Sequence, residues 1–126
     1  MSAKQVGVIS QKIIQILGLS CPPDIPIYIG VTNETHIKNH HPHDYIIYFN
    51  DISTIISQPD YVCLNPKDSS IEYVKEYQIN CEYVKIAVRI SRNGNYFVHS
   101  LYRLNNRRVS NFIQKGTLKK YEIFSF

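Results

Sequence analysis

Four histidines lie close together in this chain of 126 residues, at His36, His40, His41 and His43. The ordinary pKa of histidine, about 6.5, suits its side chain to proton transfer near neutral pH. His36 and His40 are four residues apart, so they share one face of a helix, a spacing that also suits metal ligands. No H-E-x-x-H motif accompanies them. The cluster favours a general acid and base; a metal site and surface histidines without a role are the alternatives.

A β-hairpin is predicted at Arg92–Asn95, because Asn-Gly is typical of a two-residue type I′ turn. Such a turn fixes which residues of the two strands face each other. The pairs on the predicted core face are Ile90 with Phe97, Val88 with His99, and Ile86 with Leu101. In this register His99 is a packed core histidine rather than a site residue.

The opposite face of this hairpin is the second candidate site. Side chains alternate across a strand, so five polar or aromatic residues share that face. They are Tyr83, Lys85, Arg89, Ser100 and Tyr102. Arginine and lysine match phosphate oxygens, and the hydroxyl groups can bind phosphate or ribose. The alternative is a solvated face on which Lys85 and Arg89 pair with Glu72 or Glu76 of the preceding strand.

Basic residues gather towards the C-terminus, around Phe112 and Tyr121. They are Arg103, Arg107, Arg108, Lys115, Lys119 and Lys120. Together with a net charge of +4 and a pI of about 9.0, they favour a polyanionic partner such as nucleic acid. A solvated basic helix is the alternative.

The N-terminal half predicts the helices that would carry the histidines. Helical segments are expected over residues 6–17, 33–41 and 45–56, the last as one helix or two short ones. Gly18 stops the first, Thr32 caps the second, Pro42 ends it, and Asn50 is an internal cap for the third. A short apolar run, Ile25–Ile29, separates the first two helices.

From Tyr61 onward the hydrophobic period changes to two, which predicts strands. The expected strands are Tyr61–Leu64, Ile71–Tyr77, Glu82–Ser91 and Tyr96–Leu104. A late helix over Asn106–Lys115 ends at Gly116, and Thr117–Phe126 is a predicted last strand. The fold class is therefore α+β, with N-terminal helices packed on a four- to five-stranded antiparallel sheet. Residues 1–126 are expected to form one domain.

Several classes of protein are excluded by motifs that are missing. Cys21, Cys63 and Cys81 form no C-x-x-C pair, so a disulfide framework or a thiolate zinc site is not expected. No apolar run approaches the length of about 18 residues that spans a membrane, and the N-terminus does not resemble a signal peptide. Glycine-rich phosphate loops and G-x-S-x-G are also missing, which argues against nucleotide-driven enzymes and serine hydrolases. A reducing, cytoplasmic location is expected.

The order of these parts resembles the barnase–EndoU–colicin–RelE (BECR) superfamily of metal-independent ribonucleases, and more narrowly its phage-associated nuclease branch. The resemblance extends roughly from Ile25 to Tyr121. The segments that carry it are Thr35–Pro42, Pro59–Val62, Ile71–Lys75, Val84–Arg89, Ser100–Tyr102 and Phe112–Gly116. It implies a BECR-like fold and an endoribonuclease that acts as a toxin or as a phage or mobile-element effector.

Carried over residue by residue, the resemblance implies a catalytic set. This set is His36, His41, Arg89, Ser100 and Tyr102. The family pattern has threonine where Ser100 stands, and His40 and His43 leave the identity of the second histidine open. The expected RNA contacts are Tyr83, Lys85, Arg103, Arg107, Arg108 and Lys115.

The implied reaction uses the substrate's own 2′-OH as the nucleophile, so it needs no metal or other cofactor and does not cut DNA. A histidine takes the 2′ proton, a second group protonates the leaving 5′ oxygen, and Arg89 stabilises the phosphorane. RNA is the expected partner, tRNA among the candidates, together with an antitoxin or immunity protein. The alternative functions are a non-catalytic module that binds RNA or a host protein, a metalloenzyme, and a nuclease fold that has lost its chemistry.

Overall fold

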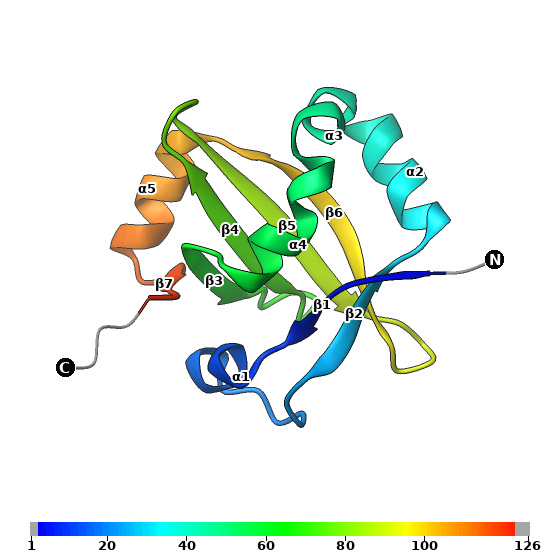
Figure 1. Ribbon diagram of the computed structural model, residues 1–126. Helices are drawn as coiled ribbons and strands as arrows, with labels where there is room; N and C mark the ends of the chain where they lie inside the picture. The colour runs from blue at the N-terminus through cyan, green and yellow to red at the C-terminus, as the bar shows by residue number, and fades with distance from the viewer. Residues whose placement is uncertain (1–2, 123–126) are drawn as a thin grey trace.

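Alternating apolar residues build a seven-stranded sheet in the computed structural model, which describes residues 3–122 (Figure 1). Across the sheet the strands are β1 (Lys4–Ile9), β2 (Ile25–Ile29), β6 (Tyr96–Leu104), β5 (Glu82–Ile90), β4 (Ile71–Tyr77), β3 (Tyr61–Leu64) and β7 (Lys119–Lys120). β2 and β6 run parallel, whereas the other neighbours are antiparallel. The α+β class is confirmed. The predicted four- to five-stranded antiparallel sheet is wrong, because β1 and β2 extend it and introduce a parallel pair.

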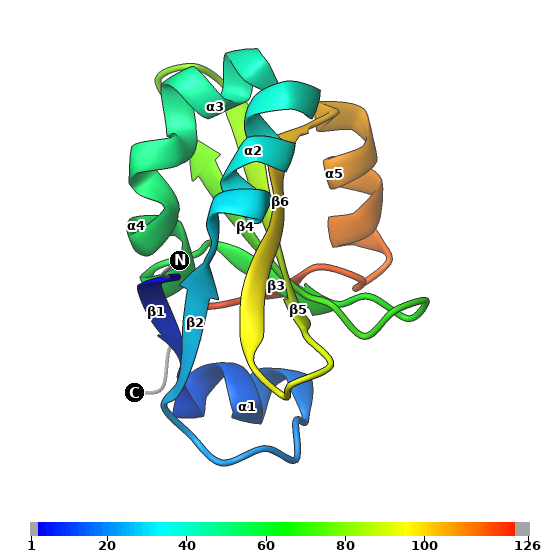
Figure 2. The ribbon, with the colours of Figure 1, turned by 90° about the vertical axis from the view of Figure 1, so that its right-hand side faces the viewer.

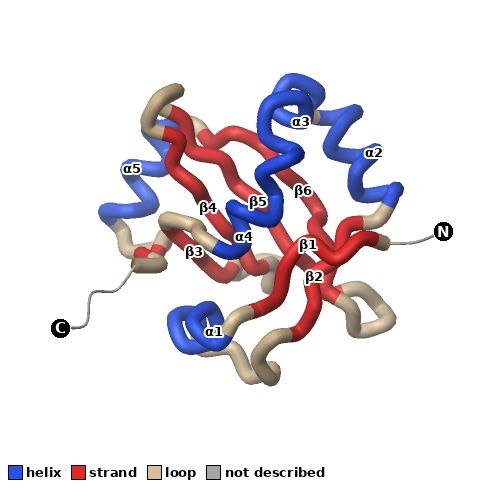
Figure 3. Tube along the Cα trace, viewed as in Figure 1, coloured by secondary structure: helices blue, strands red, loops and turns tan. Residues whose placement is uncertain are grey.

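Helices cover both faces of this sheet (Figure 3). They are α1 (Gln11–Leu17), α2 (Val31–His40), α3 (Pro42–Tyr48), the 3-10 helix η1 (Phe49–Asp51), α4 (Ile52–Ser57) and α5 (Asn106–Gln114). Figure 2 shows α4 and α5 on opposite sides of the sheet, with α2 beside β6. The late helix is thus found where it was expected, and a two-residue strand follows it; residues 123–126 of the predicted last strand lie outside the described residues.

The predicted first helix begins too early, because residues 4–9 form β1. Buried Ile9 and Ile13 belong to a strand and to the helix after it, and together they imitate one helical stripe. Ser10 separates the two elements by accepting a hydrogen bond from the Ile13 N–H at 3.2 Å, as a helix N-cap does. Gly7 lets β1 approach α4 closely, since a Cβ there would lie 2.8 Å from Ile56 Cγ2. Gly18 ends α1 with a φ of 67°, as predicted.

The next helices occur in the predicted region with different caps. α2 begins at Val31 rather than after Thr32, and the Gly30 N–H donates to Asn33 Oδ1 at 2.9 Å. The segment predicted as one or two helices forms α3, η1 and α4, and Asn50 lies inside η1 instead of capping a helix. These three short helices follow one another directly, and the last of them, α4, packs on one face of the sheet against β1, β4 and β5 (Figure 2).

The hairpin between β5 and β6 has a three-residue turn, so the predicted type I′ turn is wrong. The Ser91 N–H donates to Asn95 O at 2.7 Å, and Gly94, whose φ is 84°, donates to Ser91 O at 3.0 Å. This geometry matches a type I turn followed by a glycine bulge. Near the turn the register is consequently shifted by one residue, with Arg89 opposite Phe97.

A β-bulge at His99 restores the predicted register in the rest of the hairpin. Val88 pairs with Val98, but Ala87 pairs with Ser100, so His99 is the extra residue. Val98 takes the core position and is fully buried, while His99 is only half-buried. The expectation of a core histidine is therefore wrong, because the sequence pattern carries no sign of the bulge.

The main core lies between the sheet and the helices α1 to α4. Its largest fully buried side chains include Tyr48, Tyr73, Ile37, Ile55 and Leu101. A smaller apolar cluster lies beneath α5 and joins that helix to β3, β4 and β5; it contains Cys63, Val74, Val109 and Leu118, with Tyr83 and Phe112 against it. Within residues 3–122, no helix has both the length and the apolar character needed to cross a membrane.

Candidate active site along the edge of β6

Most of the β6 edge is free of strand neighbours, and this is where the histidines gather. β2 pairs with β6 only at Tyr96 and Phe97, and among the described residues no strand continues that pairing towards Leu104. α2 and α3 pack against this part of β6 instead (Figure 2). Side chains of the helices therefore meet side chains of β6 directly.

The rings of five residues lie along this edge in two groups, His36 with His40 and His99, and His41 with Tyr102; together we call them the histidine strip. The His36 ring lies with its centroid 4.2 Å from that of His40 and 5.6 Å from that of His99. The His41 ring stacks on Tyr102 at 4.9 Å, with 19° between the planes. Two histidines predicted from the helix thus reach two residues of β6.

His41 owes its position to the junction between α2 and α3. It is the C-cap of α2 and the N-cap of α3, with φ −137° and ψ 61°. Pro42 follows at the first position of α3, where its missing N–H has no helical partner to lose. The His41 N–H donates to Ile37 O at 2.8 Å, and its carbonyl accepts from the Tyr45 N–H at 2.8 Å. Both helices therefore hold the backbone that carries this imidazole.

Lys85 lies directly opposite Tyr102 on the neighbouring strand. Its Nζ is 4.9 Å from the centre of the Tyr102 ring and 3.3 Å from Glu72 Oε2. Glu72 is buried, and it also accepts hydrogen bonds from Cys63 Sγ and Asn65 Nδ2, each at 3.1 Å. The predicted alternative, in which Lys85 pairs with Glu72, is confirmed as a contact.

Arg89 lies further along the same strand and is held by the loop between β3 and β4. Its Nη2 contacts Asp68 Oδ2 at 2.7 Å, and its Nε donates to Ser70 Oγ at 3.1 Å. Pairing with Glu72 or Glu76 was predicted, and that part is wrong because Asp68 is nearer. About half of the Arg89 side chain remains exposed, at 45%.

Two cavities open at the ends of the histidine strip. The larger, of about 520 Å³, lies between the sheet and α5; its lining includes Asn65, Glu72, Lys85, Tyr102, Arg108 and Phe112. The smaller, of about 400 Å³, is lined by Thr32, Arg89, Phe97 and His99, among others. Both volumes lie within the range of small-ligand sites, about 300–1,000 Å³. Ser100, which pairs with Ala87, stands between the residues that line them.

Burial sets the protonation state of two histidines. It lowers the pKa of His41, aided by His40 and His36, although Asp44 acts in the opposite direction. Burial also lowers the pKa of His99, with Arg89 as the next cause. Both imidazoles are therefore neutral at pH 7, the state in which histidine accepts a proton.

The other ionisable groups of the larger cavity have distinct states. Burial acts to lower the pKa of Lys85, but Tyr102 and Glu72 outweigh it and raise that pKa, so the amine stays charged. Burial, with help from Glu72, raises the pKa of Cys63 to about 12, so its thiol stays protonated and is a poor nucleophile. The cavity thus offers a cation rather than a reactive sulfur.

Comparison with known proteins assigns this arrangement to a family. Residues 4–111 match the family model described as phage-Barnase-EndoU-ColicinE5/D-RelE like nuclease 3. The chain belongs to this nuclease family. The match confirms the resemblance to the phage-associated BECR branch and spans the whole histidine strip. No curated protein and no solved structure matches the chain.

The nuclease fold brings together most of the predicted catalytic set. His36, His41 and Tyr102 belong to the histidine strip, and Arg89 and Ser100 lie beside it. Among the predicted RNA contacts, Lys85 and Arg108 line the larger cavity, and Arg107 and Lys115 are exposed at α5. Tyr83 packs beneath α5, and Arg103 is bound to two carboxylates on the other side of β6.

Two residues of the candidate site were missed from the sequence, His99 and Asp68. Glu72 was predicted only as one of two alternative partners for Lys85, and the pairing of β4 with β5, which places it opposite Ala87 and so on the face of Lys85, selects it over Glu76. Nothing in the local sequence marks the His99 bulge or the Asp68 contact. Among residues 3–122, no three His, Cys, Asp or Glu side chains are grouped so as to hold a metal ion.

The free energy of unfolding is expected to decrease as the pH falls below about 6.5. The fold lowers the pKa of His41 and His99, so the unfolded chain binds these two protons more readily than the folded chain. The stability they confer is present above their ordinary pKa and is lost as the pH falls towards the folded values. Urea unfolding of the wild type and of the double variant His41→Gln/His99→Gln, at about pH 7.5 and 5.5, measures this contribution. An equal loss in both proteins would assign it to other groups.

Proposed function

We propose that this nuclease is a metal-independent endoribonuclease that cleaves RNA through the 2′-OH of its substrate. The observation that carries the proposal is His41, an imidazole with a lowered pKa stacked on Tyr102, whose ring lies 4.9 Å from the Lys85 ammonium. A neutral base, an aromatic ring and a cation thus lie next to one another. This is what an RNA phosphodiester with an internal nucleophile requires.

In the proposed first step, His41 Nδ1 or Nε2 takes the proton of the 2′-OH. The 2′ oxygen attacks the adjacent phosphorus, the bond to the 5′ oxygen breaks, and a 2′,3′-cyclic phosphate forms. We assign His36 to protonate the leaving 5′ oxygen, because its ring belongs to the same histidine strip. His41 ends the step with the 2′ proton and His36 ends it without its own, so His41 must release a proton and His36 must regain one, through water, before the next turnover.

The cations beside the histidine strip supply the electrostatic part of the mechanism. Lys85 and Arg89 stabilise the negative charge that builds on the phosphorane, and the Ser100 hydroxyl orients a phosphate oxygen. The Tyr102 ring stacks on a base of the RNA. Arg107, Arg108 and Lys115 hold the RNA backbone at α5, where their charges attract phosphate without reading sequence.

The phage nuclease family suggests the setting in which such an enzyme acts. We propose a toxin or a phage or mobile-element effector that works in the cytoplasm of the host or target cell, with tRNA among its substrates. A domain of this kind needs an antitoxin or immunity protein to restrain it in the cell that makes it.

Incubation of the purified protein with total tRNA in excess EDTA tests the proposal. We expect discrete fragments that end in 2′,3′-cyclic phosphate, and no cleavage of the same RNA carrying 2′-O-methyl groups, since methylation removes the nucleophile. Cleavage that stops in EDTA and returns with a divalent cation would show a metalloenzyme. Intact RNA with a saturable gel shift would instead support a non-catalytic RNA-binding module on the same fold.

A further inference from the structure

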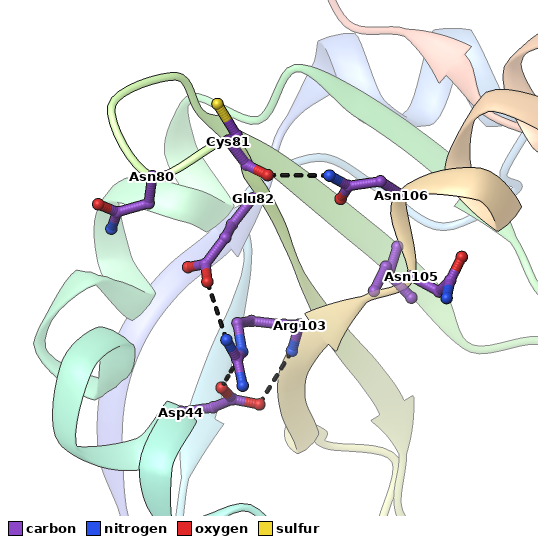
Figure 4. A pocket seen from close by; sticks show the side chains of 8 residues that line it. Asp44, Asn80, Cys81, Glu82, Arg103, Asn105 and Asn106 are labelled. Carbon is purple, nitrogen blue, oxygen red and sulfur yellow. Dashed lines mark hydrogen bonds and ion pairs between the residues drawn. The ribbon is translucent and has the colours of Figure 1, made fainter.

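Arg103 is the centre of a group of charges near the C-terminal end of β6 (Figure 4). Its Nε lies 2.6 Å from Asp44 Oδ1, and its Nη1 lies 2.8 Å from Glu82 Oε2. Its backbone N–H donates to Asp44 Oδ2 at 3.1 Å. We call Asp44, Arg103 and Glu82 the carboxylate clamp. It joins α3 to the hairpin of β5 and β6, which follows much later in the sequence.

The carboxylate clamp is well anchored at both carboxylates. Asp44 is 7% exposed, which is rare for an aspartate that is not paired. Glu82 also accepts a hydrogen bond from the Tyr48 hydroxyl, and the bonds from Tyr48 and Arg103 lower the pKa of Glu82. The Arg103 guanidinium is therefore occupied by two protein carboxylates and has little charge to offer to a phosphate.

The carboxylate clamp lies close to the proposed base, His41, in the structure. Asp44 is in the first turn of α3, the helix for which His41 is the N-cap. Tyr102 and Arg103 are neighbours on β6, and their side chains point to opposite sides of the strand. Arg103 thus holds the first turn of α3 from one side of β6, while the Tyr102 ring contacts His41 from the other. Loss of either contact would remove one of the side-chain supports of the junction that carries the imidazole.

We propose that Arg103 and Asp44 are positioning residues that hold the His41 ring on Tyr102. Their consequence for catalysis rests on the proposed function, whereas their effect on the His41 ring does not. This role replaces the direct RNA contact predicted for Arg103 from the sequence. The two roles differ in one decisive respect: the RNA contact requires only the arginine, whereas positioning requires Asp44 equally.

Nuclear magnetic resonance of the His41 imidazole tests the positioning without any substrate. Asp44→Asn and Arg103→Gln are each expected to reduce the ring-current shift that Tyr102 imposes on the His41 ring. The pKa of His41, which faces Asp44, His40, His36 and Tyr102, should fall in Asp44→Asn and rise in Arg103→Gln, because the latter leaves Asp44 uncompensated. The matched controls are the exposed residues Asp24→Asn and Arg92→Gln, which should leave the His41 signals unchanged. Unchanged signals in Asp44→Asn and Arg103→Gln would overturn the proposal.

Cleavage assays provide the second readout. Each clamp variant is expected to lower kcat by about 10–100-fold with KM within about twofold, as the loss of an orienting partner does. Arg103→Lys should retain part of the activity, and the double variant Asp44→Asn/Arg103→Gln should be no worse than either single variant. The double variant also serves as a control for folding, because it removes both charges of the Asp44–Arg103 pair instead of leaving one of them alone.

A raised KM in Arg103→Gln with normal cleavage by Asp44→Asn would show an RNA contact instead. If the wild type cleaves no RNA, the proposed function fails while the imidazole measurements still decide the positioning.

Discussion

Replacing His41 with alanine is expected to lower kcat for RNA cleavage by about 10²–10⁴-fold, the contribution of a well-placed general base. KM should change by no more than about twofold, because the charges that bind the phosphates remain in place. The physical reason is that the lowered pKa of His41 keeps its imidazole neutral at pH 7, the state that accepts a proton. Its ring is stacked on Tyr102. Single-turnover cleavage and gel-shift titration of the same RNA separate the two quantities.

His43 offers a matched control for this prediction, because it is a histidine two positions away and exposed on α3. His43→Ala should cleave RNA at close to the wild-type rate. For the wild type, cleavage should persist down to a pH below about 6.5 and then fall, since a base with a lowered pKa loses activity only once it is protonated. Equal losses in His41→Ala and His43→Ala would remove His41 from its role as base.

The part of the fold that follows local periodicity could be predicted from the sequence. β3, β4 and β6 have the predicted bounds, because each has one apolar face and clear turn residues at its ends. Lys85 opposite Tyr102 also followed from the hairpin. The parallel pairing of β2 with β6 could not be predicted, since nothing in either segment specifies so distant a partner.

The candidate site likewise has features that could be predicted from local pattern and features that depend on tertiary packing. The shared face of Lys85, Ser100 and Tyr102 was predicted from strand alternation and the hairpin register, and it holds because the bulge at His99 offsets the error in the predicted turn. The stacking of His41 on Tyr102 depends on how α2 and α3 pack against β6, which no periodicity encodes. Arg103 shows the same limit. Its charge suggests a nucleic-acid contact, but its partner Asp44 is 59 positions away in the sequence, and no local pattern indicates that pairing.

Replacing Lys85 with methionine is expected to abolish cleavage and also to destabilise the fold by about 3 kcal/mol. Methionine keeps most of the length of the side chain but removes the cation, so the buried Glu72 carboxylate is left with neutral donors only. A buried charge without its partner costs far more than an exposed one. Thermal and urea unfolding measure the stability. Lys12→Met is the matched control, since its exposed pair with Glu122 at 3.9 Å should contribute no more than about 1 kcal/mol.

A double variant, Lys85→Met/Glu72→Leu, separates the two effects. Without either charge the site is apolar, and stability should return to near the wild-type value, because an apolar pair of similar volume often replaces a buried ion pair at little cost. Cleavage should not return, since the phosphorane still lacks the Lys85 charge. If the double variant cleaved RNA at the wild-type rate, Lys85 would be a structural partner of Glu72, and Arg89 would be left to stabilise the transition state. If Lys85→Met proved as stable as the wild type, the ion pair between Lys85 and Glu72 would contribute nothing to folding, and the two remaining donors to Glu72, Cys63 and Asn65, would be enough to hold it.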